Sequence, residues 1–180
     1  ANSTLLGGKT LTEVCAMSLK NLAAWLPQVI NTLNDDVKEM GSTILEEFMI
    51  NANALLSLGL GYLTLDRASS TLSTGELQRV QLARTVKNRT TGVLYVLDEP
   101  SIGLHPANVD GLIAIMKELI KDGNSIVLVD HDTRILKEAD YMIEIGPEAG
   151  KNGGSIISQG TIDEIIQDKN SIIAEFQKWI

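Results

Sequence analysis

Two short apolar runs, separated by a helical pattern, constrain the fold of this 180-residue chain more than any other feature. The first run, Val93 to Leu97, is almost wholly apolar and fits a strand that is covered on both faces. The second, Ile126 to Val129, follows a stripe of apolar residues at helical spacing that stops at Asp122. A strand, helix, strand unit almost always makes a right-handed crossover between parallel strands. The sequence therefore predicts an α/β fold built on a parallel sheet.

Three polar side chains follow these two strands. Asp98 and Glu99 come directly after the first strand, and His131 follows the second. Because parallel strands end at the same edge of a sheet, we expect the three at one edge, where open α/β sheets bind ligands. One carboxylate can hold a magnesium ion, the other can orient a water, and a neutral imidazole can hydrogen-bond a phosphate. Simpler interpretations stay open: acids before Pro100 suit a solvated turn, and a lone histidine is more often structural.

A helix start lies upstream of the first strand. Ser73 and Glu76 have the spacing of a capping box, in which the hydroxyl satisfies an unpaired helix amide and the carboxylate reaches back. The same segment suits a phosphate, because free amides, a serine hydroxyl and the close approach allowed by Gly75 coincide there. From these residues alone the cap is the simpler interpretation, since capping boxes are common at helix starts.

The chain before the first strand has a helical pattern. Thr12 is expected to cap a helix through Leu19, and a longer helix is expected from Leu33 to Leu58. We therefore divide the chain into a helical subdomain, residues 1–90, and an α/β core part, residues 91–180.

Strand patterns recur near the C-terminus, at Tyr141 to Ile145 and at Ser155 to Ser158. Two short helices are expected to follow. Thr161 and Glu164 have capping-box spacing at the start of the first of them.

The composition limits the functions open to the chain. A formal net charge of -8 and a pI near 4.7 argue against a broad basic surface for nucleic acid. The single cysteine, Cys15, cannot form an internal disulfide or a cysteine-rich zinc site, so we expect no zinc. No apolar run reaches transmembrane length and no secretion signal is present, so we expect a cytoplasmic chain without a membrane partner.

These motifs together resemble the ATP-binding cassette (ABC) family of ATPases. The run Leu72 to Arg79 is similar to the family's signature sequence, Leu94 to Glu99 to its Walker B strand, and His131 to its switch histidine. The similarity to one branch of that family, the UvrA damage-sensing subunits of bacterial excision nucleases, extends from about Gly7 to Gly160. The stretches that carry this narrower resemblance are Gly61 to Arg67, Gly92 to His105, which includes a D-loop like that of the first of the family's two cassettes, and Ile145 to Gly150.

The resemblance implies a role for each site residue. Asp98 would be a magnesium ligand, Glu99 the base that polarises the attacking water, and His131 a sensor of the γ-phosphate. The signature would face ATP that is held by an opposite cassette, in the same or a second chain. Three of its residues would bind that nucleotide: Ser73, Gly75 and Gln78.

For the full-length protein the resemblance implies an ATPase of nucleotide excision repair, with ATP and Mg²⁺ as cofactors. It would bind damaged DNA and load a UvrB-type nuclease subunit. Whether this segment itself binds DNA is a separate question, and the basic residues near the signature are explained more simply as a solvated helix surface. They are Arg67, Arg79, Arg84, Lys87 and Arg89.

Three positions depart from the family pattern. Thr74 stands where glycine is usual, Asp130 where Glu is common, and Gly61 where an acidic residue is frequent. These differences leave a UvrA-like paralogue open. A transport or resistance cassette is a further alternative, opposed by the UvrA-type D-loop. The last alternative is a non-catalytic module that only supplies its signature to another ATPase. Glu99 and His131 argue against it.

A phosphate-binding loop requires Gly, four residues and then Gly-Lys-Ser/Thr, between a strand and a helix. The similar stretch here is Gly7-Gly8-Lys9-Thr10, and Ser3 stands where the first glycine is needed. We reject this stretch as a phosphate loop. The isolated chain is therefore expected to be nearly inactive as an ATPase.

Overall fold

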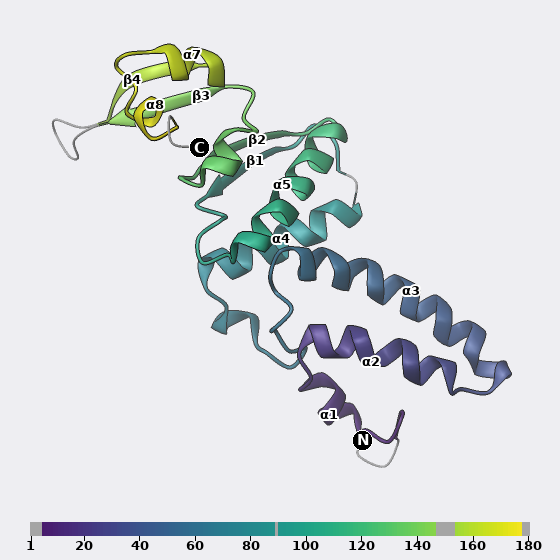
Figure 1. Ribbon diagram of the computed structural model, residues 1–180. Coiled ribbons are helices and arrows are strands. Elements are labelled where there is room, and N and C mark those ends of the chain that lie inside the picture. The colour runs from purple at the N-terminus through teal and green to yellow at the C-terminus, as the bar shows by residue number, and fades with distance from the viewer. Residues whose placement is uncertain (1–4, 89, 147–153, 178–180) are drawn as a thin grey trace. The chain divides into compact units, whose positions relative to one another are not determined.

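The computed structural model describes residues 5–88, 90–146 and 154–177 (Figure 1). The chain forms two compact units, Ala1–Val129 and Asp130–Ile180. The predicted division into a helical signature subdomain, residues 1–90, and an α/β core part, residues 91–180, stays a prediction.

The first unit begins with three helices, α1 (Leu11–Cys15), α2 (Leu19–Asn31) and α3 (Asp35–Ser57). The long helix expected from residue 33 to residue 58 is confirmed as α3. The expected cap at Thr12 is wrong, because Thr10 forms a complete capping box with Glu13 and begins α1. Ser18 then begins α2 separately. The helix expected through Leu19 therefore ends early, at Cys15, and a separate helix begins at Leu19.

The second half of this unit contains the predicted strand, helix, strand arrangement. A short turn η1 (Ser69–Thr71) leads into α4 (Thr74–Asn88), followed by β1 (Leu94–Asp98), α5 (Pro106–Lys121) and β2 (Ser125–Val129). The strands β1 and β2 are parallel, with Asp98 opposite Val129 at their carboxyl ends. The predicted α/β fold with a parallel sheet is confirmed.

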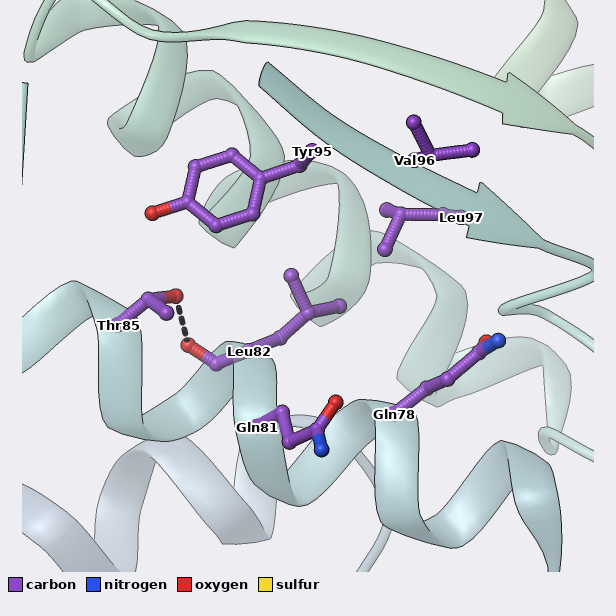
Figure 2. A pocket seen from close by; sticks show the side chains of 7 residues that line it. All are labelled: Gln78, Gln81, Leu82, Thr85, Tyr95, Val96 and Leu97. Atoms are coloured by element: carbon purple, nitrogen blue, oxygen red, sulfur yellow. Dashed lines mark hydrogen bonds between the residues drawn. The ribbon is translucent and has the colours of Figure 1, made fainter. Parts of the chain in front are cut away.

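Helices cover one face of this sheet. Leu97 is 6% exposed, and it points with Tyr95 toward α4, as Figure 2 shows. Residues on the other face are more than half exposed, including Val96 at 72% and Val127 at 54%. The expectation that both strand faces are covered is wrong for the described part of this unit, because its helices pack only where the alternate residues point.

The second unit contains α6 (Thr133–Leu136), β3 (Met142–Gly146), β4 (Ser155–Gly160), α7 (Ile162–Gln167) and α8 (Ile172–Gln177). The strands β3 and β4 are antiparallel, as their short hairpin spacing allows. Thr161 and Glu164 form the predicted capping box at the start of α7. Among the described residues of both units, no helix is both long enough and apolar enough to cross a membrane.

Candidate functional site

The carboxyl end of β1 presents the two predicted acids. Asp98 is the last residue of the strand and is exposed, whereas Glu99 follows it and is half-buried. The backbone N–H of Glu99 donates to the carbonyl of Val129, 2.8 Å away, which extends the pairing with β2 by one bond. Both acids therefore lie at the edge of the sheet where open α/β folds bind ligands.

Glu99 has an unusual backbone conformation. Its φ is 46°, and it is the one residue other than glycine among those described with a positive φ. A left-handed conformation costs a side chain with a β-carbon about 1 to 2 kcal/mol, and it persists only where surrounding contacts enforce it. Such residues cluster at active sites. This strain distinguishes Glu99 from an ordinary solvated acid.

The turn that follows enforces the conformation. The N–H of Ile102 donates to the carbonyl of Glu99 at 3.0 Å, and that of Leu104 donates to Ser101 at 2.9 Å. Pro100 is fully buried between them. Backbone bonds on both sides therefore fix Glu99 within this turn.

A residue of α4 reaches the same turn. Arg79 is 5% exposed, and its Nη1 donates to the carbonyl oxygens of Ile102 at 3.2 Å and Pro100 at 3.4 Å. Its Nε is buried without a hydrogen-bond partner. Sequence reasoning missed this link, because Arg79 and Ile102 are 23 residues apart and no local pattern joins them.

The start of α4 is the predicted capping box. The hydroxyl of Ser73 accepts from the N–H of Glu76 at 3.2 Å, and the carboxylate of Glu76 accepts from the N–H of Ser73 at 2.6 Å. Glu76 is 7% exposed, and its other oxygen accepts from the hydroxyl of Tyr62 and from Nη1 of Arg67. The local cap is thus also anchored to the preceding loop.

Electrostatics of this cluster favour the ionised acid. The hydrogen bond from Tyr62, with the backbone N–H of Ser73 next, lowers the pKa of Glu76 to about 2. Loss of hydration, followed by the bond to Glu76, raises the pKa of Tyr62. Glu76 is therefore ionised at neutral pH and holds the helix start as an anion. Sequence reasoning missed its tertiary partners.

The structure separates the three residues predicted to bind nucleotide in trans. Ser73 and Gly75 lie together at the start of α4, beside the exposed Thr74. Gln78 instead lines a cavity of about 440 Å³ between α4 and β1, and its Oε1 is buried without a partner. Figure 2 shows this cavity, whose other lining residues are Gln81, Leu82, Thr85, Tyr95, Val96 and Leu97.

His131 belongs to the second unit. It is exposed, and its N–H donates at 2.7 Å to the carboxylate of Asp130, which also accepts from Asp132 at 2.9 Å. Asp132 caps α6 and forms an ion pair with Arg134, which lowers the pKa of Asp132. The approach of His131 to the acids of the first unit stays a prediction.

The glycine pair near the N-terminus has a local role. Leu6 and Lys9 exchange two backbone hydrogen bonds of 3.0 Å across Gly7 and Gly8, which both have positive φ. This closes a tight turn, and Thr10 then caps the five-residue helix α1. The N–H groups of Leu6 and Lys9 are thus bonded within the turn, whereas a phosphate-binding loop leaves its N–H groups free for the phosphate.

The acids at the edge fit a magnesium ion. Magnesium sites commonly use one or two carboxylates, with phosphate oxygens and waters as the remaining ligands. The exposed Asp98 offers such an oxygen ligand beside Glu99. Among the residues that the structure describes, no group of three or more His, Cys, Asp or Glu side chains could hold a metal alone.

Solved structures define the class of this fold. The ATP-binding subunit of an ABC transporter matches it with a TM-score of 0.50 and 17% identity, over 96% of this chain and 73% of that one. UvrA2 from Deinococcus radiodurans matches far better, with a TM-score of 0.82 and 34% identity over 98% of this chain and 23% of that one. The fold is part of an ABC ATPase cassette.

Sequence relatives narrow the class. UvrABC system protein A of Staphylococcus epidermidis is 42% identical over 176 residues, and that of Clostridium perfringens is 40% identical over 178 residues. No protein-family model matches the sequence. Each match covers 98% of this chain but only 18% of the relative's length. It is a segment of UvrA type.

Proposed function

We propose that this segment supplies the Walker B, D-loop and signature parts of a UvrA-type ATPase. In the full-length protein, ATP hydrolysis would couple recognition of damaged DNA to loading of a UvrB-type subunit during nucleotide excision repair in the cytoplasm. The observation that carries the proposal is Glu99, held in a strained conformation beside Asp98 at the ligand-binding edge of a parallel sheet.

Each residue has a role in this reaction. Asp98 would hold Mg²⁺, which neutralises charge on phosphate oxygens when bound. Glu99 would accept a hydrogen bond from the attacking water and orient it toward the γ-phosphorus. His131 would donate a hydrogen bond to a γ-phosphate oxygen.

The start of α4 would serve an opposite cassette. Amides at a helix start attract phosphate, and Gly75 permits close approach of the backbone. Ser73 and Gly75 would therefore contact ATP held by that cassette. For Gln78, the same role requires its side chain to leave the cavity beside β1.

Hydrolysis also needs a phosphate-binding loop from outside these 180 residues. None of the sequence printed here has the required spacing after a strand. The isolated chain should accordingly bind ATP poorly and turn it over at background rate. Robust hydrolysis by the isolated chain that depends on Glu99 would contradict this part of the proposal.

The proposal is tested with Glu99→Gln in the full-length protein. Removing a general base lowers turnover by roughly 100- to 10,000-fold, if any second cassette is silenced in the same background. Glu118→Gln, at an exposed position of α5, is the matched control and should leave turnover unchanged. Normal turnover by Glu99→Gln would instead favour a non-catalytic interaction module.

A further inference from the structure

Arg79 is a buried cation to which the proposed reaction gives no role. It is 5% exposed, and its Nη1 donates to two backbone carbonyls, those of Pro100 and Ile102. Burying a guanidinium is costly unless its hydrogen bonds are made, and here Nε has no partner. A buried cation with an unsatisfied donor costs stability, so we look for a role of Arg79 other than packing.

The two carbonyls belong to the turn that carries the candidate base. Ile102 accepts from Arg79 through its carbonyl and donates to the carbonyl of Glu99 through its N–H. The turn between them contains the left-handed backbone of Glu99. The guanidinium is therefore two hydrogen bonds away from the residue whose conformation is strained.

Nη1 of Arg79 also lies near Gly75, in the first turn of α4. A β-carbon built on Gly75 would lie 3.4 Å from Nη1 of Arg79 and 3.6 Å from Cγ2 of Ile102. Gly75 therefore borders a space that both the guanidinium and the side chain of Ile102 line. The bonds of Glu76 to Tyr62 and to the N–H of Ser73 hold the same helix start.

We propose that Arg79 is a positioning residue for ATP hydrolysis, which ties the turn from Glu99 to Ile102 to the start of α4. The inference rests on the proposed role of Glu99 as base. Its consequence is a coupling within one chain: a shift of the signature at the nucleotide of the opposite cassette moves the base of this cassette. Arginine suits the role, because its planar fork is less strongly hydrated than a lysine ammonium.

The test replaces Arg79 with Lys in the full-length protein, with any second cassette silenced. Displacing a catalytic group by a fraction of an ångström should lower kcat by roughly 10- to 100-fold, with a smaller change in KM for ATP. The thermal midpoint should stay close to that of the parent. Arg84→Lys, exposed on the same helix, is the matched control and should keep the parent's kcat.

A double variant shows whether Arg79 acts through Glu99. If it does, Arg79→Lys with Glu99→Gln should have the kcat of Glu99→Gln alone. The inference would be overturned if the fold-losses in kcat of the two single variants multiplied in the double variant. It would also be overturned if Arg79→Lys alone kept the parent's kcat. If the lysine variant fails to fold, Arg79→Gln replaces it, since a neutral amide donor avoids a buried charge, and the same two outcomes apply.

The same variants separate this inference from the proposed function. If Glu99→Gln alone leaves kcat unchanged, the role of Glu99 fails and the inference with it. If Glu99→Gln lowers kcat but Arg79→Lys does not, the base stands and only the positioning role fails.

Discussion

The start of α4 and the turn after β1 each place an acid at a proposed nucleotide site, but they hold it differently. Glu76 is satisfied by its own helix cap and by Tyr62 and Arg67, in a relaxed helical conformation. Glu99 has a strained backbone that depends on Val129 and on the turn to Ile102. The difference favours a structural role for Glu76, whereas the strain at Glu99 agrees with the chemical role that we propose for it.

The largest effect that tests this comparison is Glu76→Ala. It removes a buried acceptor from the N–H of Ser73 and from Tyr62, so we expect a loss of roughly 2 to 3 kcal/mol in the free energy of unfolding. Urea denaturation of the 180-residue chain measures it. A loss close to zero would show that the cluster does not hold the helix start.

Acid denaturation gives a second test of Glu76. Its pKa is lowered from 4.5 to about 2 on folding, so its stabilising contribution is present above pH 4.5 and is lost as pH falls toward 2. Glu76→Gln should therefore flatten the dependence of stability on pH in this window, relative to the parent. Parallel pH profiles for the two proteins would contradict the assignment.

The opposite sign is expected at Glu99. Asparagine tolerates the left-handed region better than glutamate, so Glu99→Asn should raise the free energy of unfolding by about 0.5 to 1 kcal/mol. The same substitution should abolish ATP turnover in the full-length protein. A clear loss of stability would show that the turn favours glutamate for structural reasons.

The smallest stability effect is expected at Gly75. A β-carbon there meets ordinary contact distances, so Gly75→Ala should be neutral or stabilise by about 0.5 kcal/mol. Turnover in the full-length protein should nevertheless fall, because the methyl group occupies the approach to the helix amides. Glu118→Gln, exposed on α5, is the control and should leave turnover unchanged.

Local patterns predicted much of this structure, and contacts distant in sequence account for what was missed. The strand, helix, strand unit and the Ser73 cap depend on neighbouring residues and on apolar periodicity, which a sequence displays directly. The cap at Thr12 was wrong because Thr10 has the better-placed glutamate. The bonds of Tyr62 and Arg79 cross 14 and 23 residues, so no spacing rule reveals them.

The wrong expectation that both faces of the β1–β2 sheet are covered has a different cause. An apolar run such as that around Val96 indicates burial, but it does not say which partner provides the cover. The roles of Asp98, Glu99 and His131 likewise stay predictions, since they depend on groups that the chain alone does not supply.

Single-turnover hydrolysis by full-length Glu99→Gln tests the central claim most directly, because it separates nucleotide binding from chemistry. The account predicts ATP affinity close to that of the parent and a hydrolysis step slower by roughly 100- to 10,000-fold, with any second cassette silenced. Hydrolysis at the parent's rate would contradict the assignment of Glu99 as the base.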